Sequence, residues 1–290
     1  SFLLAPGITR ACYASVIRTI DTPQNDLGSD KIQTSISVPT ESGAMSACEN
    51  FADGSTTAYV VHIAEGTNAS ARNEFMTLST RAGGCLLAPQ TTIVHGTALG
   101  TPEFETMAAA GMRLVWSPKS NLFLYGATTR IDLAIGAGVA TIALAPDWSL
   151  GGSVNLLDEM RAADAVDAAE YGDILTPRRL VDMVTIDAAR ALGVDAMLGS
   201  IEVGKRADLT ILNDVGVPDP YDAVLAATPA QIGLVLVDGR PLYGDTALLA
   251  SLPAGPPCET VDICGVGKFL CLAEADPANL LDQTFADVVG

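Results

Sequence analysis

Short apolar runs rich in β-branched residues alternate with longer amphipathic stretches over the first half of the chain. The runs are CYASVIRTID, KIQTSISVP, TAYVVHIAE, TTIVHGT, RLVWSP and ATIALAPD. Between them lie ASARNEFMTLSTRAG, TPEFETMAAAG and TTRIDLAIGAG, and each ends at a glycine, which is typical just past a helix. This alternation predicts six parallel strands joined by crossover helices.

The second half changes character near residue 196. Before that point the pattern predicts two long helices, over 155–172 and 176–193, the second with Thr176 as N-cap and Pro177 at its first position. After it, strand-like runs are separated by Gly, Pro and Asp. We therefore expect one α/β domain over residues 1–195 and a small β domain with a tail over 196–290.

Polar residues at strand ends decide between two α/β architectures. Strand–helix alternation fits either an open doubly wound sheet or a closed (β/α)8 barrel. His62, His95 and Asp147 each follow an apolar run, and a barrel builds its active site from such carboxyl ends. A TIM barrel is therefore the favoured fold.

Composition excludes several classes of partner. The chain has 290 residues, 49% hydrophobic and 17% charged, which is typical of a globular protein. Its net charge of -18 repels nucleic acids and anionic membrane surfaces. The apolar, uncharged run over 133–146 is shorter than the ~20 residues of a membrane span. The first residues, SFLLAPGITR, lack the basic start of a signal peptide.

The cysteines leave the localisation open. Cys258, Cys264 and Cys271 match no C-x-x-C zinc or redox pattern. Their spacing allows a Cys258–Cys264 disulfide or buried thiols, and a disulfide would indicate export rather than a cytoplasmic protein.

The strand ends carry residues suited to a metal. The chain has only two histidines, and two imidazoles with one carboxylate suit a divalent transition metal, with zinc as the first candidate. A bound metal lowers the pKa of a water molecule to about 7, so hydrolysis is the expected chemistry. Glu65, one turn after His62, is a candidate general acid. The alternative is that each of these side chains is a hydrogen-bonded structural residue.

Several segments together carry a family likeness. The order VVHIAEG, IVHGTAL, VWSPKSNLFLYG, ALAPDWSLGGSVNLLDEM and LGSIEVGKRADLTIL resembles the metal-dependent amidohydrolase superfamily, especially its cytosine deaminase and chlorohydrolase branches. The likeness runs from about residue 55 to residue 245. It implies that His62 is a metal ligand, Glu65 a proton shuttle, His95 a metal ligand or a polariser of the substrate, and Asp147 a metal ligand and general base.

The resemblance also implies a substrate-binding set and a C-terminal β structure. The implied set comprises Ser117, Ser120, Asn121, Ser149 and Ser153. GSIEVGKRADLTIL resembles the return of the chain into the small β-sandwich that accompanies the barrel.

One departure from the family pattern is large. The family's first strand carries a His-x-His pair, and this sequence contains none. CYASVIRTID then corresponds to the third strand, which predicts an N-terminally truncated barrel. Members of the family that bind two metals often use a carboxylated lysine at the end of the fourth strand. In this sequence Lys31 lies at the start of that strand instead. The pattern therefore favours a single divalent metal, zinc or else iron.

Three functions follow in order of preference. The first is a metal-dependent hydrolase of C–N bonds in a small molecule, such as an amide, a cyclic amidine or an amino- or chloro-heterocycle. The second is a catalytically incomplete relative that serves as a binding or assembly module, whose exposed strand edges favour self-association into a homo-oligomer. The third, a nucleotide-binding sheet, lacks a glycine-rich phosphate motif.

Overall fold

The computed structural model describes residues 31–148, 150–252 and 258–271. These residues form two compact units, and the boundary falls between Ser200 and Ile201, whereas the sequence predicts it after residue 195. A parallel five-stranded sheet organises the first unit and an antiparallel five-stranded sheet the second. Among the described residues, no helix combines the length and apolar character that crossing a bilayer requires.

The parallel sheet has its strands in sequence order. They are β1 (Ile32–Ser35), β2 (Ala58–Ile63), β3 (Thr91–His95), β4 (Arg113–Trp116) and β5 (Ile142–Leu144). Every neighbouring pair is parallel, and the register sets Ile63 beside His95. The carboxyl ends therefore lie along one edge of the sheet, as the sequence predicts. The remaining predicted strand, CYASVIRTID, comes first in the sequence and lies outside the described residues.

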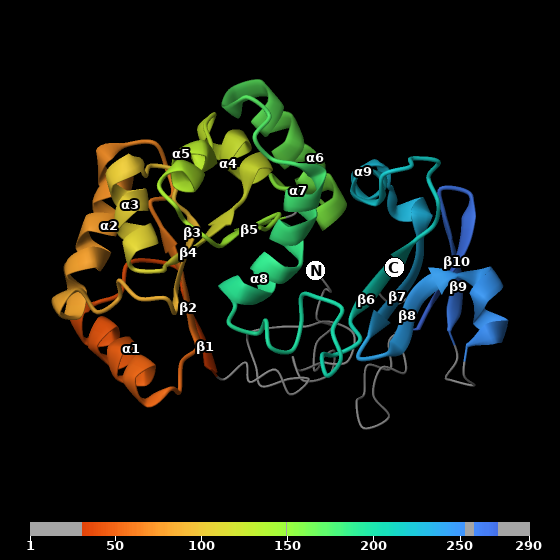
Figure 1. Cartoon of the computed structure of the whole chain (residues 1–290), viewed down its shortest axis with the longest axis horizontal. Helices are drawn as coiled ribbons and strands as arrows, with labels where there is room; N and C mark the ends of the chain where they lie inside the picture. Colours follow the sequence, from red (N-terminus) through yellow and green to blue (C-terminus); the bar gives the residue numbers. More distant parts are fainter. Residues whose placement is uncertain (1–30, 149, 253–257, 272–290) are drawn as a thin grey trace. The chain divides into compact units, whose positions relative to one another are not determined.

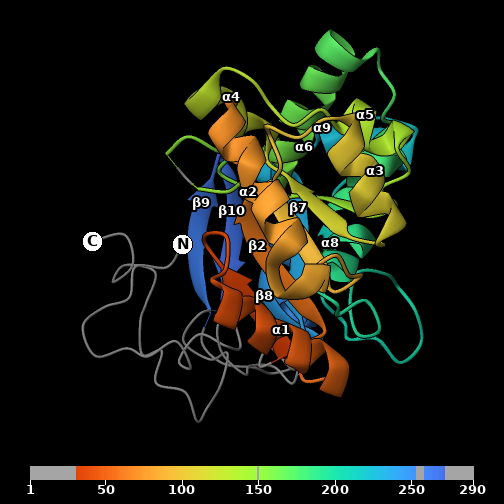
Figure 2. The ribbon, with the colours of Figure 1, turned by 90° about the vertical axis from the view of Figure 1, so that its left-hand side faces the viewer.

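Helices connect these strands and cover the sheet. α1 (Glu41–Asp53), α2 (Ala69–Thr80) and α3 (Thr101–Ala109) stand in a row on one side of the sheet (Figures 1 and 2). Thr40 and Asn68 cap the first two, each accepting a hydrogen bond from a backbone N–H three residues on. α1 buries mainly Ala44 and Ala47, a stripe too small to stand out in the hydrophobic pattern.

The segment after β4 is a helix, α4 (Pro118–Tyr125), where the sequence pattern gave no helix. Pro118 occupies its first turn, and Gly126 ends it in the left-handed conformation. Its buried residues are Pro118, Ser120 and Asn121, so the buried face is polar and shows no apolar periodicity. α5 (Ile131–Gly136) follows and leads into β5.

Both predicted long helices are interrupted. The first continues from α6 (Leu156–Val166) into a π-helical turn, η4 (Asp167–Tyr171). The second is divided at Thr185, with φ -120° and ψ -95°, into α7 (Pro177–Val184) and α8 (Ile186–Ala191). Thr176 is the predicted N-cap and accepts a hydrogen bond from Arg179 N. α7 packs against β5, and α8 packs against β4 and β5.

The core of this unit lies between the sheet and its helices. Its largest fully buried apolar side chains are Ile63, Phe75, Leu78, Leu86, Ile93, Phe104, Met107, Met112, Leu114 and Trp116. Burying such a side chain contributes about 1.5–3 kcal/mol, so this core fixes the strands whose ends carry polar residues. Cys48 of α1 also forms a disulfide with Cys85, which follows the 3-10 turn η3 (Arg81–Gly84), across a Cα–Cα distance of 6.1 Å.

The second unit contains one described antiparallel sheet. Its strands are, in spatial order, β6 (Leu209–Leu212), β7 (Ile232–Val237), β8 (Arg240–Asp245), β10 (Val266–Leu270) and β9 (Glu259–Ile263). The helix α9 (Pro220–Ala226) and the 3-10 turns η5 (Pro229–Gln231) and η6 (Thr246–Ser251) complete it. Lys268 is fully buried there, and its Nζ donates to Ala230 O, Ile232 O and Asp245.

The Cys258–Cys264 disulfide that the spacing allowed does not form, and neither does a set of three buried thiols. Cys258 is bonded to Cys271, and Cys264 is a free, exposed thiol. The reason is the β9–β10 hairpin, which pairs Glu259 with Leu270 and so brings the residues just outside the hairpin together. Cys264 lies in the hairpin turn. The prediction of export was tied to a Cys258–Cys264 bond, and the disulfides present are Cys48–Cys85 and Cys258–Cys271 instead.

Candidate functional site

The backbone turns sharply at three strand ends. Ala64, His95 and Asp147 have φ values of 58°, 71° and 64°, in the left-handed region that residues other than glycine rarely adopt. Ala64 follows β2, His95 ends β3 and Asp147 follows β5. Such conformations cost roughly 1–3 kcal/mol each and cluster at functional sites. The carboxyl edge of the sheet is therefore the candidate site.

The two histidines lie side by side at this edge. Their ring centroids are 5.2 Å apart with an interplanar angle of 53°. His62 Nδ1 is 3.3 Å from Ser35 O, the carbonyl at the end of β1. His62 is partly buried, whereas the His95 side chain is 1% exposed. Parallel pairing of β2 and β3 therefore brings together residues that are far apart in the sequence.

His95 is held at both its side chain and its backbone. Its Nδ1 is 3.2 Å from Asn121 Nδ2, and its carbonyl accepts a 2.6 Å hydrogen bond from Thr129 Oγ1. Burial lowers the pKa of His95, and this outweighs the opposite effect of the Glu65 and Asp147 carboxylates. His95 is therefore neutral at pH 7.

Glu65 reaches the same place from the turn after β2. Its Oε2 is 3.6 Å from His95 Nε2, and its Oε1 accepts a 2.9 Å hydrogen bond from the Tyr125 hydroxyl. Burial first, and the hydrogen bond to Glu65 second, raise the pKa of Tyr125 to about 12. The phenol therefore stays protonated at neutral pH and donates to the carboxylate.

Asp147 is oriented by α4. Ser120 Oγ donates a short hydrogen bond to Asp147 Oδ2. The same helix supplies Asn121 to His95 and Tyr125 to Glu65, so three of its side chains each fix one predicted catalytic residue. Asn121 and Tyr125 are four residues apart and therefore on one face of the helix.

The predicted substrate-binding residues lie deep in the protein. Ser117, Ser120, Asn121 and Ser153 are at most 3% exposed, and Ser149 lies outside the described residues. Ser120 and Asn121 contact Asp147 and His95, as described above. Their role toward a substrate stays a prediction.

A buried glutamate accompanies these residues. Glu159 of α6 is completely buried, and its Oε1 accepts a 3.4 Å hydrogen bond from the backbone N–H of Lys119. Burial raises the pKa of Glu159, and Asp147 adds to the rise, while Ser153 and Lys119 lower it. Glu159 thus connects α6 to the start of α4.

The donors of the site match zinc in kind. His62 has Nε2 turned away from its backbone partner, and imidazole and carboxylate are ordinary zinc ligands. Among the described residues, however, no three His, Cys, Asp or Glu side chains converge on one point as a finished metal site does. His62 and Asp147 are the residues that could contribute to such a site, together with further donors.

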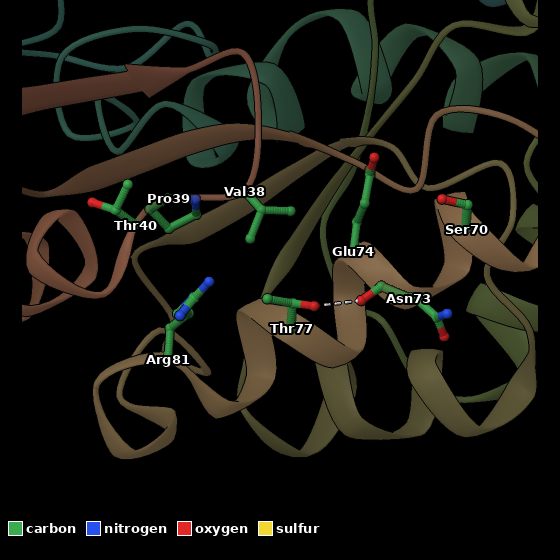
Figure 3. A pocket seen from close by; sticks show the side chains of 8 residues that line it. All are labelled: Val38, Pro39, Thr40, Ser70, Asn73, Glu74, Thr77 and Arg81. Atoms are coloured by element: carbon green, nitrogen blue, oxygen red, sulfur yellow. Dashed lines mark hydrogen bonds between the residues drawn. The ribbon is translucent and has the colours of Figure 1, made fainter.

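A separate hollow lies beside α2. It has a volume of about 370 Å³ and is lined by Val38, Pro39, Thr40, Ser70, Asn73, Glu74, Thr77 and Arg81 (Figure 3). Glu74 connects it to the strand end, because its Oε2 accepts a 2.8 Å hydrogen bond from Ala64 N. None of the predicted catalytic residues lines this hollow.

Several residues of the site were not predicted. They are Tyr125, Thr129 and Glu159, together with Trp116 and Thr128, whose indole Nε1 and hydroxyl oxygen lie 2.8 Å apart next to Asn121. If PKSNLFLY is taken as a helix, the i, i+4 spacing of Asn121 and Tyr125 places both side chains on one face, and this could have predicted Tyr125 as a residue of the site. Thr128 and Trp116 carried no signal, because their contacts depend on tertiary packing.

Similar proteins were found by sequence. The chain is 27% identical over 162 residues to an S-triazine hydrolase of Gordonia rubripertincta, a match covering 53% of the chain and 34% of that protein. It is 32% identical over 161 residues to a 5-methylthioadenosine/S-adenosylhomocysteine deaminase of Symbiobacterium thermophilum, covering 52% of the chain and 37% of that protein. The matches span about a third of these relatives' length.

Similar structures agree with the parallel sheet. An adenosine deaminase from Xanthomonas campestris, solved with bound zinc, superimposes with a TM-score of 0.62 at 24% identity, covering 73% of the chain and 52% of that protein. A zinc-complexed atrazine chlorohydrolase from Arthrobacter aurescens TC1 gives 0.61 at 22%, covering 72% and 49%. These likenesses show a TIM-barrel-like α/β fold. The Amidohydrolase family model matches residues 30–242, most of the described chain, and the chain therefore belongs to the amidohydrolase family.

Proposed function

We propose that this chain carries the active site of a metal-dependent hydrolase that cleaves C–N or similar bonds in a small molecule. The observation that carries the proposal is the grouping of His62, Glu65, His95 and Asp147 at the carboxyl ends of β2, β3 and β5, with Glu65 3.6 Å from His95. The matched relatives are hydrolases and deaminases, which does not favour the alternative of a non-catalytic module.

The metal is proposed to be one divalent ion, zinc before iron. His62 and Asp147 would hold it, with His95 as a third ligand or as a neighbour that acts on the substrate. When bound, such an ion supplies Lewis acidity and an acidified water molecule as nucleophile. The zinc in the adenosine deaminase and chlorohydrolase structures supports the choice of metal.

The remaining steps belong to the side chains. Asp147 accepts the proton of the attacking water, and the Ser120 hydroxyl holds its Oδ2 by a hydrogen bond. Glu65 takes up at Oε2 the proton that the water still carries after it has added to the substrate, and passes it to the leaving nitrogen or oxygen, while Tyr125 holds Oε1. His95, buried and neutral, faces the same space.

The proposed substrates are aminated or chlorinated heterocycles, cyclic amidines or amides. S-triazine hydrolase and several adenosine-type deaminases among the relatives support a nitrogen heterocycle. Ser117, Ser120, Asn121 and Ser153 are proposed to border the substrate. The proposed architecture is a (β/α)8 barrel in which β1 to β5 are its fourth to eighth strands, followed by part of a β-sandwich.

The test has two separate measurements. Elemental analysis of the purified chain and of a His62→Ala, His95→Ala double variant measures bound metal, with Glu105→Gln as a surface control. Ammonia and chloride release from a panel of amino- and chloro-triazines and adenosine derivatives measures activity, with Asp147→Asn as the inactive reference. Near-stoichiometric metal that is lost in the double variant, together with release that is lost in Asp147→Asn, supports the proposal. A metal-free chain with no release overturns it.

A further inference from the structure

A chain of buried hydrogen bonds begins at Trp116. Its indole Nε1 lies 2.8 Å from Thr128 Oγ1, and both side chains are buried. An indole N–H can only donate, so the Thr128 oxygen accepts this hydrogen bond. The hydroxyl proton of Thr128 is then available for its other neighbour, Asn121 Oδ1, at 3.4 Å. Thr128 therefore accepts from Trp116 and donates to Asn121 Oδ1.

The amide of Asn121 is oriented by what surrounds its oxygen. Oδ1 faces Thr128 and also lies 3.5 Å from Thr129 Oγ1, whose own proton goes to His95 O at 2.6 Å. With Oδ1 on the threonine side, the amide nitrogen Nδ2 faces His95 Nδ1 at 3.2 Å. The opposite orientation would place an NH2 group against the donating hydroxyl of Thr128.

The proton of His95 follows from this orientation. An amide NH2 only donates, so His95 Nδ1 accepts, and a neutral imidazole then carries its proton on Nε2. We propose that Trp116, Thr128 and Asn121 form a positioning relay that fixes His95 as the Nε2–H tautomer. That N–H faces Glu65 Oε2 at 3.6 Å.

His62 has the opposite arrangement. Its Nδ1 faces Ser35 O at 3.3 Å, and a carbonyl only accepts, so Nδ1 carries the proton and Nε2 keeps its lone pair. The two histidines therefore differ in role, His62 as an acceptor or ligand at Nε2 and His95 as a donor at Nε2. The catalytic meaning of this difference rests on the proposed function, whereas the tautomers do not.

The tautomers of both histidines can be measured directly because the chain contains only two of them. With only two histidines, a sample labelled with [15N]histidine contains only two imidazoles, and a His62→Gln variant assigns them. Long-range proton–nitrogen correlation spectra distinguish the protonated from the unprotonated ring nitrogen of each. Spectra are recorded with a chelator at about pH 8, above the ordinary histidine pKa of about 6.5. The expected result is Nδ1–H for His62 and Nε2–H for His95.

Two variants test the relay, and a third is the control. Asn121→Asp replaces the donating NH2 with an acceptor and is expected to invert the tautomer of His95. Thr128→Val keeps the shape but removes the hydroxyl, and is expected to give a mixture of tautomers. Thr97→Val removes a buried hydroxyl that has no hydrogen-bond partner among the described residues, and should leave both imidazoles unchanged.

The outcomes separate the relay from the function. An Nδ1–H form of His95 in the unmodified chain overturns the proposal, and this measurement needs no variant to fold. An unchanged His95 in a folded Thr128→Val variant also overturns the relay. The predicted tautomers in a chain without hydrolase activity support the relay and count against the proposed function instead.

Discussion

Removing the charge of Glu103 should weaken the contact between α2 and α3, the helices that pack beside β2 and β3. The effect should be present at neutral pH and lost at acidic pH. Glu103 of α3 is 5% exposed at its side chain, and its Oε1 accepts from Arg72 of α2 at 2.8 Å from Nε and 2.7 Å from the second guanidinium nitrogen. Its Oε2 accepts from Gly100 N at 3.0 Å. The Glu103→Gln variant keeps the shape and removes the charge.

The magnitude follows from these contacts. Hydrogen bonds to a charged group contribute about 1.5–3 kcal/mol. The Arg72 side chain is 48% exposed, so solvent screens its charge and can hydrate it when the partner is lost. We therefore expect Glu103→Gln to lower the free energy of unfolding by about 1.5 kcal/mol at pH 7. Glu105→Gln, the same change at an exposed position of α3, should cost less than about 0.5 kcal/mol.

The pH dependence gives the sharper test. Burial alone would raise the pKa of Glu103, but the hydrogen bonds from Arg72 and Gly100 outweigh it and hold the pKa below its usual value. A carboxyl group with a lowered pKa stabilises the folded state above its unfolded pKa, about 4.5, and loses this contribution as pH falls through the folded pKa. The difference between wild type and Glu103→Gln should therefore shrink below about pH 4.5.

Urea unfolding followed by tryptophan fluorescence measures this difference in the relevant unit. The chain has two tryptophans, Trp116 and Trp148, and both lie in the unit that ends at Ser200. Two results would refute the reasoning. The first is an equal free energy of unfolding for Glu103→Gln and wild type at pH 7. The second is a difference in this free energy that stays constant from pH 7 down to about pH 3.5.

Three further changes have defined outcomes. Tyr125→Phe removes the donor to Glu65 and should lower kcat/KM about 10-fold, the effect of roughly 1.4 kcal/mol, while leaving bound metal unchanged; equal kcat/KM would contradict the role of the hydroxyl. Asp147→Asn should reduce both metal content and activity, and full metal content would show that the carboxylate is not a ligand. Breaking the Cys258–Cys271 disulfide with Cys258→Ser should destabilise the antiparallel unit by about 3 kcal/mol, measured by hydrogen exchange in β10; unchanged exchange would contradict it.

The strands were predictable because their apolar runs are buried on both sides. All five strands of the parallel sheet coincide with predicted runs, and β2 to β5 are mostly buried apolar sequence, as a parallel sheet requires, whereas the edge strand β1 is only partly buried. The helix α4 was not predictable by the same means. Its buried face carries Ser120 and Asn121, which satisfy polar neighbours rather than an apolar core.

The site was predictable in its strand-end residues and not in its supporting contacts. His62, His95 and Asp147 follow apolar runs, so strand alternation and register place them at one edge. The bond from Trp116 to Thr128 joins residues whose pairing depends on how the segment after α4 folds back. Similarly, the pairing of Cys258 with Cys271 required the β9–β10 register, which spacing alone does not supply.

The three contacts from α4 limit how this protein can be re-engineered. A designer who grafts a new loop between β4 and β5 would replace the partners of Asp147, His95 and Glu65 together, so changes in selectivity and in turnover could not be separated. In the segment after β5, Leu150 and Val154 offer more freedom because they are 81% and 74% exposed, whereas Asp147 and Ser153 belong to the proposed site. Libraries for altered selectivity belong there, with the sequence of α4 left intact.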